Sequence, residues 1–332
     1  MTRYQYIKTQ FSRHCEPAKQ SIVSVIAGLI RNLHTQQRGF RNKFGITQAI
    51  LAVSLFFFSA CTEEIELKTT NSAPVIVIYG CLSEDTVYQT VRVTLSSPYF
   101  ELEPNKPVSN AILTIQSSDN QTYELAETIE RGLYRTREPM AATPGITYRL
   151  TVSADPNQNG NVKHYEATTT MQRPFVVDTI SIEEMYIMGF KHYTLKIYAQ
   201  EEAGPAFYCA RAIINDSLTT SRISRYTVFS DFGIDGHYWD GLPLMQFENY
   251  ENARFETANS RAHFIKPGDK ITFCISLIET GYFDFIQQCQ SERRGENPFF
   301  GGPASNIMTN ISNGGVGYFA AFCTTRLDAY VP

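Results

Sequence analysis

Alternating apolar and polar positions dominate the chain from about residue 75 onward, and they predict short β-strands. The first run is VIVIYGCL, at residues 75–82, and TVYQTVRVTLS follows it with apolar residues at alternate positions. NAILTIQSSDNQTYELAE then predicts two strands around the turn-forming residues SDN. A period of two places alternate side chains on the same face, which is typical of half-buried strands.

Six or seven such strands fit into residues 74–173, with turn-forming residues at regular spacing between them. This density of short strands indicates an immunoglobulin-like β-sandwich. Within PGITYRLTV, Tyr148 is expected to be a corner tyrosine whose hydroxyl ties a crossover loop to the backbone. The first folded module is therefore predicted to be a sandwich, and the protein to be mainly β.

A second β-rich module is predicted for residues 174–332, after Pro174. HYTLKIYAQ, FYCARAIIN and DKITFCISLIE are among its expected strands. One amphipathic helix is predicted near residues 280–293, in GYFDFIQQCQSERR. Its apolar positions recur at i, i+3, i+4 and i+7, so they form one face that packs against a sheet. These positions are Tyr282, Phe285, Ile286 and Cys289.

Residues 38–60 resemble the signal peptide of a bacterial lipoprotein. A basic head is followed by an apolar segment, residues 46–58, which has the length of a signal-peptide core and is short for a bilayer span. The segment ends in FFFSACTEEIEL, so that small residues precede a cysteine and acidic residues follow it. The residues before the expected cut are Phe58, Ser59 and Ala60.

Cleavage at this point would make Cys61 the acylated first residue of the mature chain. Several acyl chains on one residue hold a protein at a membrane far more firmly than a single chain. Residues 61–73 then form an acidic tether, in which Glu63 and Glu64 resemble a tag for export to the outer face of an outer membrane. The alternative is an ordinary solvated linker. Residues 1–37 are expected to be an N-terminal extension that lies upstream of the true translation start, because lipoprotein signals begin closer to their cleavage site.

The charge of the chain excludes one class of function. Residues 1–60 hold eight Lys and Arg and one acid, which leaves 21 basic and 32 acidic residues, a charge near −11, for the rest of the chain. Because nucleic-acid binding depends on neutralising phosphates, this charge argues against it.

Five of the seven cysteines lie beyond Cys61 without any C-x-x-C pair. They are expected to be buried small apolar residues, with at most one chance disulfide.

No catalytic, cofactor-binding or metal-binding motif is evident. The sequence has no G-x-S-x-G elbow and no Gly-rich phosphate loop. The histidines of the mature chain show no paired spacing: His164, His192, His237 and His263. In SDFGIDGHYWDG, the acids Asp231, Asp235 and Asp240 are four and five residues apart, whereas a calcium loop places its oxygens at alternate positions. We therefore predict no catalytic residue, no metal site and no cofactor.

Two loops are candidates for ligand contact. SDFGIDGHYWDG is interpreted either as a hairpin turn or as a loop that exposes Tyr238 and Trp239 as an aromatic platform for a sugar or peptide. SNIMTNISNGG is interpreted either as local turns or as a recognition loop containing Asn306 and Asn310. In the turn interpretation, the glycines of this second loop, Gly314 and Gly315, take positive φ.

The order of motifs along the mature chain resembles a known family. CTEEIEL, PVIVIYGCLS, PVSNAILTIQ, RGLYRT, PGITYRLTV, IKPGDKITFCISLIETGYFDFI and NPFFGGPASNIMTNISNGGVGYFAAF occur in this order. Over residues 61–326 the chain resembles the Bacteroidota lipoproteins that carry domain of unknown function 4249. The resemblance implies an outer-membrane lipoprotein that assists a TonB-dependent receptor, with Cys61 as the acylated residue. It implies no catalytic residue.

The expected function is therefore a non-enzymatic surface lipoprotein, held in the outer membrane by acyl chains. Its expected partner is a TonB-dependent β-barrel receptor, and its ligand is unknown. Two alternatives stay open: a surface hydrolase that uses carboxylates of the second module, and a structural or adhesive surface protein.

Overall fold

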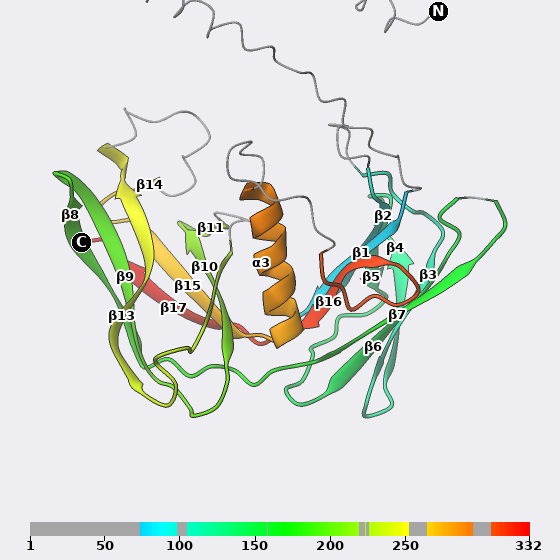
Figure 1. Ribbon diagram of the computed structural model, residues 1–332, viewed down its shortest axis with the longest axis horizontal. Helices are drawn as coiled ribbons and strands as arrows, with labels where there is room; N and C mark the ends of the chain where they lie inside the picture. Colours follow the sequence, from blue (N-terminus) through cyan, green and yellow to red (C-terminus); the bar gives the residue numbers. More distant parts are fainter. Residues whose placement is uncertain are drawn as a thin grey trace, which may run out of the picture. The chain divides into compact units, whose positions relative to one another are not determined.

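A computed structural model describes residues 74–97, 105–157, 159–218, 223, 226–251, 264–294 and 307–332 (Figure 1). They all belong to one unit of the chain, Asn71–Pro332. The predicted signal peptide, the tether and the N-terminal extension lie outside the described residues. No helix in the described part of the chain has the length and apolar character needed to cross a bilayer.

The first module is an eight-stranded sheet in the order β16-β1-β2-β5-β4-β3-β6-β7. Apolar residues of its strands alternate between buried and more exposed positions, as in β1, because each strand buries only one face. The strands are β1 (Ile76–Leu82), β2 (Thr90–Leu95), β3 (Ile112–Ser117), β4 (Thr122–Glu127), β5 (Leu133–Thr136), β6 (Thr147–Ala154), β7 (Lys163–Thr170) and β16 (Val316–Ala321).

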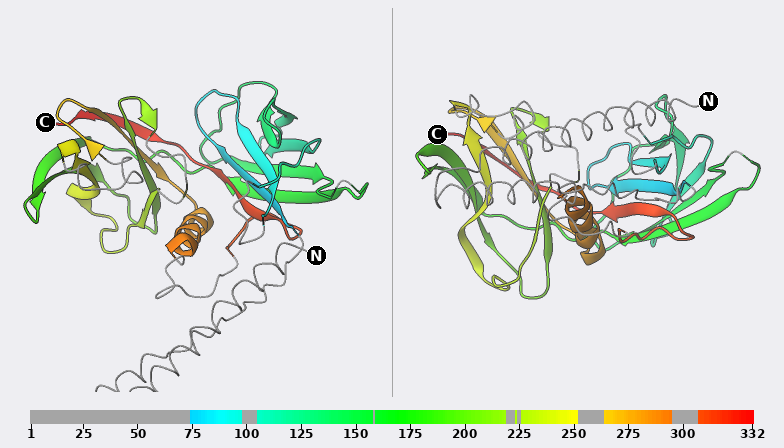
Figure 2. Two further views of the ribbon diagram at one scale, coloured as in Figure 1. Left: turned by 90° about the horizontal axis from the view of Figure 1, so that it is seen from above. Right: turned by 45° about the horizontal axis from the view of Figure 1, so that its top comes forward.

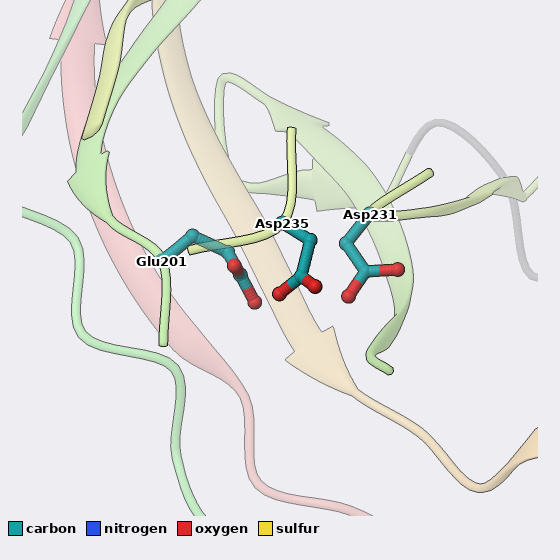
Figure 3. Close-up of side chains that lie close together, drawn as sticks. All are labelled: Glu201, Asp231 and Asp235. Atoms are coloured by element: carbon teal, nitrogen blue, oxygen red, sulfur yellow. The ribbon is translucent and has the colours of Figure 1, made fainter. Parts of the chain in front are cut away.

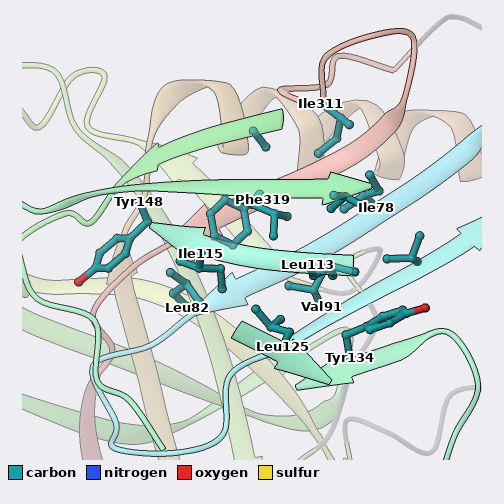
Figure 4. Close-up of a cluster of buried hydrophobic side chains, with 14 of the residues drawn as sticks. Ile78, Leu82, Val91, Leu113, Ile115, Leu125, Tyr134, Tyr148, Ile311 and Phe319 are labelled. Carbon is teal, nitrogen blue, oxygen red and sulfur yellow. The ribbon is translucent and has the colours of Figure 1, made fainter. Parts of the chain in front are cut away.

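The two faces of the expected sandwich are two halves of this one curled sheet. Buried side chains from opposite strands, among them Ile78, Leu113 and Phe319, fill its interior (Figure 4). The corner tyrosine is confirmed, because the Thr143 N–H donates a hydrogen bond of 2.8 Å to the Tyr148 hydroxyl. The prediction of a mainly β fold is confirmed with it.

Strand β16 comes from the region expected to lie wholly in the second module. It pairs in parallel with β1, with Val77 opposite Val316. A second link joins β16 to β7, since Gln172 and Phe322 form a parallel bridge just beyond the two strands. The last part of the chain thus returns to close the first module.

The second module packs a four-stranded sheet against a five-stranded sheet in the described residues. The four-stranded sheet has the order β14-β13-β9-β8, and the other has the order β11-β10-β15-β17 with β12 paired to β10. The strands are β8 (Thr179–Ile187), β9 (Phe190–Gln200), β10 (Phe207–Ile214), β11 (Ser217–Leu218), β12 (Thr227–Ser230), β13 (Tyr238–Asn249), β14 (Phe264–Ile265), β15 (Lys270–Leu277) and β17 (Thr325–Tyr330).

Helix α3 (Thr280–Arg294) lies between the two modules (Figure 2). Tyr282, Phe285 and Ile286 are buried in a cluster that includes residues of β1, β10 and β16. The hydroxyl of Tyr282 lies 2.9 Å from the hydroxyl of Tyr79 on β1. The predicted helix and its apolar face are confirmed, and the helix packs against strands of both modules in a cluster separate from their two cores.

Candidate functional site

A cleft of about 670 Å³ lies where the two modules meet. One wall comes from the end of β7 and the segment after it, and a second comes from the loop between β9 and β10. The third wall is the junction of β15 with the N-terminus of α3. Polar and apolar residues both line it: Thr168, Gln172, Arg173, Glu202, Ala203, Gly204, Pro205, Ala206, Phe207, Leu277, Ile278, Glu279, Thr280, Gly281 and Tyr318.

Three carboxylates hold the β9–β10 loop in place (Figure 3). Asp235 accepts a hydrogen bond of 2.8 Å from the Gly204 N–H, and Asp231 accepts one of 2.8 Å from the Ala206 N–H. Glu201, at the start of the same loop, accepts the Tyr208 hydroxyl at 3.1 Å. Backbone donors of a loop need such acceptors where the loop is partly buried. The acids therefore fix the wall of the cleft that the loop forms.

The same carboxylates resemble a set of ligands for a hard cation. One oxygen from each of Glu201, Asp231 and Asp235 lies within 4.8 Å of the others. An all-oxygen set of this kind suits Ca²⁺ or Mg²⁺. However, each of the three acids already accepts a hydrogen bond from its own surroundings. These hydrogen bonds explain why the three acids lie together: they support the loop.

The opposite wall of the cleft is held by Glu279. Its two oxygens accept the Thr169 hydroxyl at 2.7 Å and the Thr170 N–H at 2.9 Å, so that the start of α3 is tied to β7. Near the mouth, the Arg173 guanidinium lies 2.8 Å from the carboxylate of Glu202. The three walls are thus fixed to one another by polar contacts between segments that are far apart in the sequence.

Burial and nearby acids shift the ionisation of two tyrosines beside the cleft. Burial, followed by the charges of Glu279 and Asp284, raises the pKa of Tyr318 to about 12. The pKa of Tyr208 is also raised, first by burial and then by Glu201. Both hydroxyls are protonated at neutral pH, and that of Tyr208 donates its hydrogen bond to Glu201.

The predicted aromatic platform is wrong for one of its two residues. Trp239 is only 2% exposed, whereas Tyr238 is 49% exposed. Neighbouring residues of a strand point to opposite faces, and the inward face of β13 places Trp239 against Phe175 and Tyr208 in the core. The hairpin interpretation is also wrong, because β12 pairs with β10 while β13 pairs with β9. The loop between them connects two different sheets.

Asn310 makes structural hydrogen bonds, and its predicted ligand contact stays a prediction. Its amide donates to the carbonyls of Thr168 at 3.1 Å and Phe319 at 2.8 Å, and its oxygen accepts the Phe319 N–H at 3.0 Å. Gly314 has the predicted positive φ, of 73°. Gly315 does not, and its lack of a side chain instead allows Ile311 to approach closely. Asn306 lies outside the described residues.

Other residues named from the sequence are dispersed or not described. Among the described residues, His164, His192 and His237 lie on β7, β9 and the loop before β13, and none of them lines the cleft. Of the five cysteines in the described part, Cys209, Cys274 and Cys323 are buried as expected, whereas Cys81 and Cys289 are only partly buried. Asp240 is exposed and lies outside the carboxylate cluster. Phe58, Ser59, Ala60, Cys61, Glu63, Glu64 and His263 lie outside the described residues.

The comparison with protein families agrees with the order of motifs in the sequence. A family model described as a domain of unknown function (DUF4249) matches residues 62–327. The chain belongs to the DUF4249 family. No curated protein matched the chain in a separate search. The DUF4249 match includes both modules and α3, and therefore every residue that lines the cleft.

Sequence reasoning missed the cleft of this DUF4249 protein because its polar residues belong to unrelated segments. Arg173 follows β7, Glu202 lies in the β9–β10 loop, and Glu279 precedes α3. Each of them has the sequence context of an ordinary surface charge. The one local signal was Pro174, which marks the passage between the modules where the cleft lies.

Proposed function

We propose that the protein is a non-enzymatic lipoprotein of the outer-membrane surface that binds a ligand for a TonB-dependent receptor. In this proposal, Cys61 carries the acyl chains and the two modules form the exposed, ligand-binding body. Confinement to the membrane plane raises the concentration of the protein near a membrane-embedded receptor, even where their mutual affinity is modest.

The observation that carries the proposal is the start of the family match. The match begins at residue 62, directly after Cys61. This start supports a mature chain that begins at Cys61, as cleavage of a lipoprotein signal would produce.

The cleft supports a role in ligand binding. Its volume of about 670 Å³ is in the range of small-molecule sites. Phe207 offers an aromatic surface there, and Gln172 and Thr280 offer hydrogen-bonding groups. A purely structural or adhesive module would not need such a cleft, so its presence favours capture of a ligand.

A surface hydrolase is the competing proposal, since two carboxylates line the cleft. Glu202 is paired with Arg173, and both oxygens of Glu279 accept hydrogen bonds from β7. Acid–base catalysis requires carboxylates that reach the substrate. Because these two are engaged in holding the cleft together, the geometry favours binding over hydrolysis.

Metabolic labelling and native purification test the proposal. The wild-type protein, produced in a Bacteroidota host, should incorporate labelled palmitate and co-purify in mild detergent with a large β-barrel protein. The variant Cys61→Ala should lose the label. An unlabelled wild-type protein would refute the anchor, and a labelled protein that repeatedly purifies alone would refute the receptor partnership.

A further inference from the structure

The tip of the β8–β9 hairpin exposes apolar side chains at the end of a sheet. This tip consists of Tyr186, Ile187, Met188, Gly189 and Phe190. Tyr186 is 68% exposed and Met188 is 95% exposed. Adjacent large apolar side chains on a surface mark contact with another apolar phase more often than scattered ones do.

Met188 also occupies a backbone position that is unfavourable for methionine. Ile187 pairs with Phe190, so Met188 and Gly189 form a two-residue turn with φ values of 50° and 84°. Such turns ordinarily contain Asn-Gly or Asp-Gly. The other non-glycine residues of positive φ in the described ranges are all Asn or Asp: Asn110, Asn120, Asn215, Asp216 and Asn313. The turn therefore retains an exposed apolar side chain where a polar one would fit its backbone better.

The tip lies at the end of the folded body where its first strand, β1, begins. The tip and the start of β1 lie at the same end, at the top of Figure 1. The loop between β12 and β13 lies at the opposite end, since Tyr238 pairs with Gln200 at the far end of β9. Thirteen steps of chain separate Cys61 from Pro74, a reach of at most about 45 Å. The end that bears the tip can therefore face the membrane that holds Cys61.

We propose that the tip, through Tyr186, Met188 and their neighbours, inserts into the interfacial region of the bilayer in which Cys61 is anchored. This inference rests on the proposed lipid anchor. Tyrosine favours the membrane interface, and methionine and isoleucine favour the adjoining acyl chains. Insertion is limited to the tip, because Lys191, directly opposite Tyr186, forms an ion pair with Glu184 on the side away from the turn.

A second copy of the chain fits this surface less well than a bilayer does. Stable protein interfaces bury about 800 Å² on each partner. The tip is a single two-residue turn with its flanking residues, so it offers much less area than this. A bilayer requires no complementary surface, and the acyl chains on Cys61 would already supply most of the affinity.

Tryptophan scanning of the acylated, full-length protein in vesicles tests the inference. Met188→Trp and Tyr186→Trp place probes at the tip, and Phe232→Trp is the matched control because Phe232 is 94% exposed in the loop after β12. The native Trp239 is buried and contributes equally to every variant. In phosphatidylethanolamine–phosphatidylglycerol vesicles with brominated acyl chains, we expect at least twofold quenching of the tip probes and a blue shift of their emission. The control should show neither.

Each alternative outcome overturns the inference in a distinct way. If the protein floats with the vesicles but the tip probes resemble Phe232→Trp, insertion is refuted while the anchor stands. If the protein does not float, the anchor at Cys61 fails and the inference fails with it. If the tip emission shifts to the blue without lipid, in proportion to protein concentration, the tip contacts a second copy instead.

Discussion

Replacement of Asn310 by alanine should destabilise the fold, because its side chain joins β7 to β16. The change removes three hydrogen bonds, to the carbonyls of Thr168 and Phe319 and from the Phe319 N–H. At about 1 kcal/mol for each bond, the loss is about 3 kcal/mol. The N–H and carbonyl of Phe319 would lose these partners at a part-buried site, which makes a smaller effect unexpected.

Thermal unfolding of the mature domain, residues 62–332, measures this loss. A change of 1 kcal/mol shifts the Tm of a domain of this size by about 2–4 °C, so Asn310→Ala should lower it by about 6–12 °C. The matched control is Asn157→Ala, since Asn157 is an exposed asparagine in the loop between β6 and β7. The control should stay within about 0.5 kcal/mol of the wild type.

The result that would refute this reasoning is an Asn310→Ala variant as stable as the control. Such a variant would show that the β7–β16 junction holds without the amide. Asn310 would then again be a candidate for ligand contact, as its loop suggested from the sequence. A large loss of stability would instead establish the residue as a link that closes the first module.

Two further predictions concern β16 and a buried thiol. Gly317→Ala should destabilise the domain by more than about 4 kcal/mol, because a Cβ there would lie 2.1 Å from the Ile78 carbonyl oxygen at a φ of 109°. Gly314→Ala, which meets no atom within 4 Å, should cost only about 1 kcal/mol in urea titrations. Burial raises the pKa of the Cys209 thiol to about 12, so the unfolded chain ionises this thiol at lower pH than the folded protein does. The contribution of this thiol to the free energy of unfolding is therefore fully present below about pH 8.5. Above that pH it should fall by up to about 1.4 kcal/mol per pH unit. Cys209→Ala should make this alkaline loss shallower, and equal slopes for the two proteins would contradict the explanation.

Local patterns predicted the elements well because strands and helices depend on periodicities within a few residues. The apolar positions of α3 are buried as expected, and Tyr148 makes the expected corner hydrogen bond. The return of β16 to β1 could not be predicted in this way. The two strands are separated by more than two hundred residues, and no local pattern specifies which distant edge a strand will join.

The loop around Trp239 shows how a local pattern misleads where two sheets meet. The acids and glycines of SDFGIDG indicate a turn, and the structure does contain one. Its acids nevertheless serve a different segment, because Asp231 and Asp235 accept backbone N–H groups of the β9–β10 loop. The partner Glu201 is thirty residues away from Asp231 in the sequence, so the cluster became apparent only from the packing of the two sheets.

The positions of the cleft and the hairpin tip lead to a geometric expectation for the proposed receptor. Gln200 and the cleft-lining Glu202 lie at one end of β9 and the tip lies at the other, which separates them by about 35 Å along eleven residues of strand. If the tip touches the bilayer, the cleft opens well above the membrane surface. A ligand bound there would be available from the medium, but it would lie far from the acyl chains. A receptor that takes the ligand must therefore contact this body through parts that project from the membrane, and loss of the tip contact should weaken transfer without weakening binding in the cleft.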